Sequence, residues 1–162
     1  MHYGRQTLDL GSAKLMCTRI VGARSDKHIV EHLEEYRLLL LEARGQGHKL
    51  VDILDIRDAA PPTAKQRRMQ GEWNTEYEAL MRQTLVGFTF VVSSTVMRGI
   101  ITAIMWIKPL PVPTAVFTQL EDAIAWGFER LGEEGVAVSW AKREDARRVF
   151  GVRELSGVSA LR

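Results

Sequence analysis

The stretch LVGFTFVVSSTVMRGIITAIMWI, residues 85–107, decides how the chain is interpreted. It carries one charge, Arg98, and roughly 20 apolar residues suffice for a helix to cross a bilayer. That charge would lie near the middle of the span and would cost roughly 2.5–3.5 kcal/mol. Residues 86–92 have the β-branched and aromatic side chains of a buried strand, and the hydroxyl residues 93–95 can cap an opening helix. We therefore expect a strand and a helix of a folded domain here, and no transmembrane span.

The segments on either side alternate between strand and helix patterns. The first predicted elements are a β-hairpin over 6–21 that turns at Gly11-Ser12 and a helix that begins at Ser25 or Asp26 and ends at Gly45 to Gly47. A strand over 48–56, a helix after Pro61-Pro62 and the strand and helix of 85–107 follow. The last two are a strand over 113–117 and a helix that runs from a capping box at Thr118–Glu121 to Gly132. Such alternation favours a mainly parallel sheet joined by right-handed crossovers. The predicted fold class is α/β, with a mixed, mainly parallel sheet of about five strands, an N-terminal hairpin and about four helices.

The length of 162 residues is that of one domain with a tail. We assign residues 1–132 to the α/β domain and residues 133–162 to a basic C-terminal appendage that contains a short helix. The appendage is basic because residues 142–162 hold six Lys or Arg and three Asp or Glu, whereas the whole chain has a net charge of only +2.

The predicted helix over 95–107 has more apolar residues than one sheet contact needs. We expect one stripe to face the sheet, and four further apolar residues then remain on the flanks. A helix that is apolar nearly all round is covered on more than one side, and the cover is a neighbouring segment, a partner protein or an apolar ligand. The expected sheet-facing stripe is Val96, Ile100, Ala103, Ile104 and Ile107, and the candidate interaction surface is Met97, Arg98, Ile101, Met105 and Trp106.

Catalytic and metal-binding patterns are weak. His28 and His32 are four residues apart on one helix face, as in a zinc pair, but no further ligand completes the motif, so we expect a solvated face. Asp52 and Asp55 differ by an odd number of residues within a strand and should point to opposite faces, which does not favour paired acid–base catalysis. No phosphate-binding glycine motif or nucleophile elbow is present. We predict no catalytic residue, cofactor or metal.

Composition indicates a cytoplasmic protein. Apolar residues make up 46% and charged residues 26% of the chain, which is ordinary for a globular domain. The single cysteine, Cys17, cannot form an intrachain disulfide, and the N-terminal residues lack the pattern of a secretory signal. Basic clusters at 65–68 and 142–148 have no interleaved aromatic residues, so we expect no nucleic-acid partner.

Four pieces of sequence carry a family resemblance over roughly residues 5–131. They are LVDILDIRDAAPPTAKQRR (50–68), VVSSTVMRGIITAI (91–104), VPTAVF (112–117) and LEDAIAW (120–126). Together they resemble the STAS-like domain of the anti-sigma-factor-antagonist superfamily, which shares its core with lipid-binding CRAL-TRIO domains. The resemblance implies a bacterial, cytoplasmic regulatory module that binds other proteins without enzymatic activity.

In the phosphoswitch members of that superfamily, an Asp followed by Ser or Thr opens the helix after the third strand. Here Asp58 is followed by Ala59, and two prolines precede Thr63. Asp58 and Thr63 therefore mark the candidate switch loop, and the departure from the pattern favours a helix-start role for Thr63.

The sequence thus supports a leading functional hypothesis and two alternatives. The first is a non-enzymatic protein-interaction module that forms homodimers through the 95–107 helix. The second is a carrier of a hydrophobic ligand or lipid, of CRAL-TRIO type, with a cavity between that helix and the sheet. The third is an enzyme of unknown chemistry.

Overall fold

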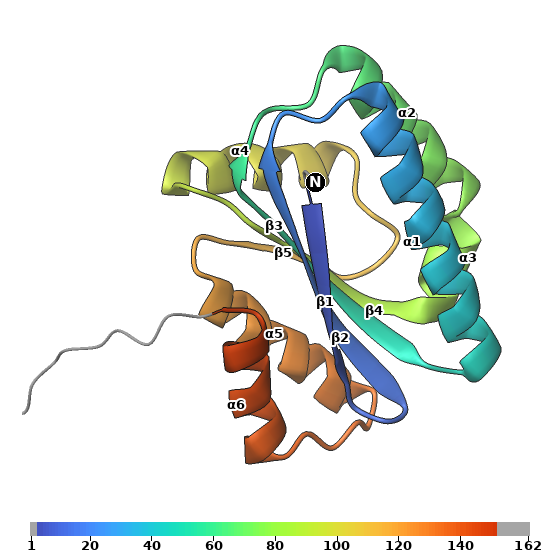
Figure 1. Cartoon of the computed structure of the whole chain (residues 1–162), viewed down its shortest axis with the longest axis vertical. Helices are drawn as coiled ribbons and strands as arrows, with labels where there is room; N and C mark the ends of the chain where they lie inside the picture. The colour runs from blue at the N-terminus through green and yellow to red at the C-terminus, as the bar shows by residue number, and fades with distance from the viewer. Residues whose placement is uncertain (1–2, 152–162) are drawn as a thin grey trace, which may run out of the picture.

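Five strands form one mixed sheet in the computed structural model, which describes residues 3–151 (Figure 1). The strand order is β1-β2-β3-β4-β5, with β1 and β2 antiparallel and all other neighbours parallel. This confirms the predicted hairpin and mainly parallel sheet. The strands are β1 (Tyr3–Asp9), β2 (Ala13–Gly22), β3 (Lys49–Ala59), β4 (Leu85–Val91) and β5 (Thr114–Phe117).

Six helices accompany the sheet within residues 3–151, where we predicted about four. The helix expected after Pro61-Pro62 is divided at Tyr77, and the last helix is the short one predicted within residues 133–162. The predicted Thr118 capping box is wrong, because Gln119 is the N-cap of its helix and makes no side-chain cap hydrogen bond. The helices are α1 (Asp26–Gln46), α2 (Ala64–Glu76), α3 (Glu78–Thr84), α4 (Thr95–Ile107), α5 (Leu120–Glu133) and α6 (Trp140–Val149).

Helices cover both faces of the sheet, and each face has its own hydrophobic core (Figure 1). Successive strand residues point to opposite faces, so Met16 and Leu50 pack under α1–α3 while Leu15 and Val51 pack under α5 and α6. The α6 helix belongs to this second core through Ala146, which is fully buried. The last residues of the predicted basic tail, including Arg153 and Arg162, lie outside the described residues.

Residues 85–107 form two elements, as predicted. β4 ends at Val91, and the Ser94 side chain accepts a hydrogen bond from the Met97 N–H at 3.2 Å to open α4. Among residues 3–151, no helix is both long enough and apolar enough to cross a membrane.

The orientation of α4 differs from the prediction. α4 has no buried residue, and it contacts the sheet at the edge strand β5. The apolar residues of the 108–113 connection explain this, because Leu110 and Val112 pack against the core under α1–α3. They occupy sheet surface that the helix would otherwise cover. The stripe that we expected to face the sheet, Val96, Ile100, Ala103, Ile104 and Ile107, is exposed instead.

Candidate functional site

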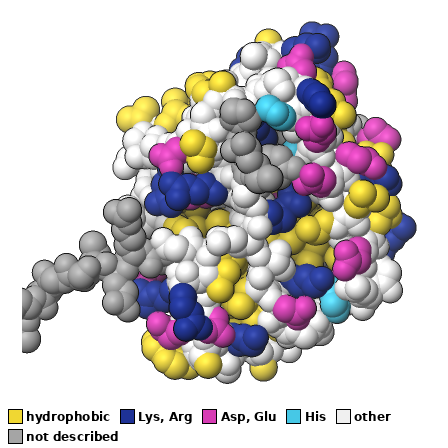
Figure 2. Space-filling view, in the orientation of Figure 1, with side chains coloured by type: hydrophobic (Ala, Val, Ile, Leu, Met, Phe, Trp, Pro, Cys, Tyr) yellow, Lys and Arg dark blue, Asp and Glu magenta, His cyan; other side chains and the backbone are white. Residues whose placement is uncertain are grey.

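The outer face of α4 is an exposed apolar surface. Val96, Ile100 and Ile104 recur every four residues along it and are 73%, 48% and 46% exposed. Trp106 and Ile107 at the end of the helix are 85% and 86% exposed. Figure 2 shows hydrophobic side chains at the upper left of the molecule, where Figure 1 places α4. Exposed apolar residues that form a contiguous patch mark interaction sites more often than isolated ones do.

Beside this surface is a shallow hollow built from small residues. Gly99 and Ala103 line it together with larger side chains, among them Arg98 and Trp106. Its volume is about 430 Å³. The candidate interaction residues are therefore divided: Arg98 and Trp106 are exposed at the hollow, whereas Met97, Ile101 and Met105 are half-buried. We define the α4 surface as Val96, Gly99, Ile100, Ala103, Ile104, Trp106 and Ile107.

A second groove, of about 560 Å³, separates the end of α4 from α2 and α3. Ile104 and Met105 line it on one side, and Gly71 and Glu78 line it on the other. Leu110 of the connection to β5 also lines it. The pockets that α4 lines are therefore open grooves along its sides.

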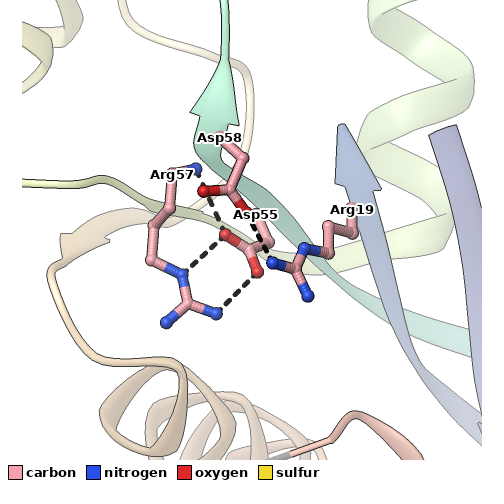
Figure 3. A network of polar contacts seen from close by, with 4 residues as sticks. All are labelled: Arg19, Asp55, Arg57 and Asp58. Carbon is pink, nitrogen blue, oxygen red and sulfur yellow. Dashed lines mark hydrogen bonds and ion pairs between the residues drawn. The ribbon is translucent and has the colours of Figure 1, made fainter. Parts of the chain in front are cut away.

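Two ion pairs lie at the carboxyl ends of β2 and β3, where open α/β sheets bind ligands (Figure 3). Arg57 donates to the buried Asp55 through Nε (2.9 Å) and Nη2 (2.8 Å). Arg19 donates to Asp58 at 2.5 Å, and both of these side chains are exposed. Asp58, one of the two candidate switch residues, is therefore the acidic partner of an exposed ion pair.

A pocket of about 480 Å³ lies next to these ion pairs and contains Cys17. Burial, followed by the charges of Asp55 and Asp52, raises the pKa of Cys17 to about 12. The thiol is therefore protonated at neutral pH, and a protonated thiol is a poor nucleophile. The raised pKa therefore gives no support for Cys17 as a nucleophile.

Thr63, the other candidate switch residue, is the N-cap of α2. Its hydroxyl accepts a hydrogen bond from the Gln66 N–H at 3.2 Å, and the Gln66 side chain accepts from the Thr63 N–H at 3.1 Å. Gln66 also donates to the Arg24 carbonyl and to Asp26. This capping box gives Thr63 a structural role of the kind that we expected.

A buried polar cluster under α1 was not predicted from the sequence. Asp52 faces this side of the sheet and Asp55 faces the other. This confirms the prediction that the two side chains point to opposite faces. His32 and Tyr36 of α1 lie beside Asp52 around a small cavity. His32 is buried, so the expectation of a solvated face is wrong for this residue. The available signal was an ionisable residue inside the apolar strand pattern of residues 48–56. Within residues 3–151, no group of three or more His, Cys, Asp or Glu residues could hold a metal ion.

Comparison with solved structures supports the fold. The chain is similar to an uncharacterized protein of the DUF3478 family with a SpoIIAA-like fold, from Shewanella loihica PV-4, with a TM-score of 0.56 and 12% sequence identity. The match covers 77% of this chain and 93% of the other. The fold is SpoIIAA-like. This fold is that of STAS-like domains, so the predicted α/β fold and the fold that the STAS-like resemblance implies are confirmed. No protein-family profile matches the sequence, and no curated protein matches it.

Proposed function

We propose that the chain is a STAS-like regulatory module that acts without catalysis and forms a homodimer through the α4 surface. The observation that carries this proposal is a helix with five large, exposed apolar residues and no buried one. Leaving such residues in water forgoes roughly 1.5–3 kcal/mol for each side chain that could be buried. A protein contact on this face would recover part of that free energy.

A second copy is the occupant that the shape of α4 favours. Ile100 and Ile104 project from the helix, and the hollow over Gly99 and Ala103 lies beside them. A two-fold interface joins the same patch of two copies, so a projecting side chain of one helix can enter the hollow of the other. Arg98 is the only charged residue in α4, and like-charge repulsion across the interface would be small.

The expected dimer is weak and reversible. A helix of this length is about 20 Å long, and stable interfaces bury roughly 1,200–2,000 Å² in total. Two crossing α4 helices alone fall at or below the lower end of that range. We therefore expect a dissociation constant on the order of micromolar or weaker.

Light scattering over a concentration series tests the proposal. The wild type should increase in mean mass with concentration, and Ile100→Glu/Ile104→Glu should remain monomeric at every concentration. Val30→Glu/Leu38→Glu is the matched control, because Val30 and Leu38 are 54% and 52% exposed on α1, away from α4. A wild type that is monomeric throughout, or equal effects of the two double variants, contradicts the homodimer.

The groove between α4 and α2/α3 favours one alternative, the carrier of a hydrophobic ligand. Ile104, Met105 and Leu110 give this groove an apolar wall. Native mass spectrometry of the purified protein would reveal a copurified lipid as an added mass. An apo spectrum together with concentration-dependent dimerisation would favour the interaction module.

A further inference from the structure

A small cavity lies between α1, α2 and the sheet, apart from the α4 surface. Its volume is about 90 Å³, the space of roughly three water molecules. Most of its wall is apolar, and the aromatic rings of Tyr36, Phe88 and Phe90 contribute to it. The lining residues are His32, Leu33, Tyr36, Asp52, Leu54, Gln70, Asn74, Met81, Phe88, Phe90 and Leu110.

Two buried side chains in this wall, Asp52 and Tyr36, each have an oxygen without a hydrogen bond of normal geometry to the described residues. Asp52 is 3% exposed and Tyr36 is 6% exposed. Tyr36 lies close enough to Asp52 to lower the pKa of that carboxyl, yet neither Asp52 Oδ1 nor Tyr36 Oη has a hydrogen bond of normal geometry. A buried polar atom without a partner costs roughly 1–3 kcal/mol, and more when it is charged.

Asp52 carries the negative charge that faces the cavity. Burial raises the pKa of Asp52 to about 6, so most of it is ionised at neutral pH. Burial lowers the pKa of His32 to about 4, so the imidazole is neutral there. Gln70 and Asn74 of α2 are uncharged, and the Gln70 amide donates to Asn74 at 3.1 Å.

Arg5 of β1 is the cation whose charge acts on Asp52, and Arg24 acts on His32; neither lines the cavity. Arg5 Nε donates to Thr18 at 3.0 Å, and its guanidinium carbon lies 5.4 Å from the Tyr36 ring centroid. Its charge lowers the pKa of Asp52. Arg5 Nη2 is itself without a partner among the described residues, so Arg5 stabilises the Asp52 carboxylate through space and leaves Asp52 Oδ1 open to a ligand.

We propose that this cavity binds a small primary ammonium ion whose N–H groups donate to Asp52 Oδ1 and Tyr36 Oη. A carboxylate beside aromatic faces is the chemistry that recognises organic cations. The ammonium group satisfies both unpartnered oxygens, and its alkyl chain packs against the apolar wall formed in part by Leu33 and Met81. The volume limits the ligand to about three or four non-hydrogen atoms.

The groove beside α4 provides a route of entry. Asn74 and Leu110 line both the cavity and the groove between α4 and α2/α3. They line both spaces, so we take the groove as the route by which the ammonium ion reaches the cavity.

An NMR titration with n-propylammonium chloride tests the proposal. A ligand of about four non-hydrogen atoms can bind no more tightly than roughly tens of micromolar, so the titration extends to high millimolar concentrations. We expect saturable shifts of the amide signals of Tyr36, Asp52 and Phe88. Sodium chloride controls for ionic strength, and propan-1-ol controls for the same shape without charge.

Two variants and the pH of the titration make the test specific. Asp52→Asn should weaken propylammonium binding at least tenfold, whereas Asp58→Asn, at an exposed carboxylate on the other side of the domain, should leave it unchanged. In the wild type, binding should weaken about tenfold from pH 7.5 to pH 5 as Asp52 takes up a proton. The wild-type pH series decides the question even where Asp52→Asn perturbs folding.

Three results would overturn the proposal. Equal affinity of wild type and Asp52→Asn would place the binding elsewhere. Equal affinity for propan-1-ol would show an apolar cavity without cation recognition. Amide signals that show no saturable shift would mean that the cavity holds water alone.

Discussion

Asp52 and Asp55, three residues apart on β3, lie on opposite faces of the sheet and differ in whether their charge is paired. Asp55 accepts two hydrogen bonds from Arg57, whereas Asp52 Oδ1 has no partner among the described residues. Both side chains are nearly inaccessible to solvent, at 2–3% exposure. The two carboxylates should therefore have opposite effects on stability when their charge is altered.

Asp52→Asn should stabilise the protein above about pH 6 and have little effect near pH 4. Asp52 has a pKa raised from 3.8 to about 6 in the folded state, so the folded protein binds more protons than the unfolded chain between these values, and stability falls as the pH rises. The shift corresponds to about 3 kcal/mol at most. Urea unfolding at pH 4 and pH 8 measures the difference, and an asparagine variant that is less stable at pH 8 contradicts it.

His32 should make the stability of the folded protein rise with pH, opposite to Asp52, over nearly the same pH range. Its pKa is lowered from 6.5 to about 4 in the folded state, so the unfolded chain binds more protons and stability falls as the pH drops from about 6.5 to 4. His32→Asn should remove that loss, and unfolding of wild type and variant across this range is the measurement. Parallel stability curves would show that His32 does not titrate as described.

Arg57→Met should destabilise the protein more than Arg19→Met. Removing one partner of a buried ion pair costs roughly 3–5 kcal/mol, and the Arg57 side chain is 32% exposed, so we expect about 2–3 kcal/mol. The Arg19–Asp58 pair is exposed on both sides, and such pairs contribute roughly 0–1 kcal/mol. Denaturant unfolding of the two variants under the same conditions compares them, and equal losses would contradict the difference in burial.

Gly127→Ala and Gly45→Ala should change stability in opposite directions. A Cβ atom at Gly127 of α5 would lie 2.9 Å from Leu15 Cδ1 and 3.1 Å from Val51 Cγ1, both in the core, and overpacking of this kind costs roughly 1–3 kcal/mol. A Cβ at Gly45 of α1 would meet nothing within 4 Å, so alanine should add roughly 0.5–1 kcal/mol. Thermal unfolding of both variants checks the signs, and a stabilised Gly127→Ala would mean that α5 can move away from the sheet.

Local patterns predicted most of the fold. Periodicity, turn residues and caps act within a few residues of the chain. They were enough to predict the hairpin, the three crossovers and the division of residues 85–107 into β4 and α4. The prediction of a capping box at Thr118 was wrong because the sequence has the required residue types, but α5 begins after Gln119. The break at Tyr77 was not predicted because one apolar stripe, Met69, Trp73, Tyr77, Leu80 and Met81, continues through it.

The sequence by itself determined the order and type of the elements, since these depend on neighbouring residues. Tertiary structure decided which face of α4 is exposed, because both faces are apolar and Leu110 and Val112 compete with the helix for the sheet. It also decided that Asp52 and Tyr36 meet at one cavity. The contact between these two residues depends on how α1 packs across β3. This is a long-range contact, and the spacing of residues along the chain does not predict it.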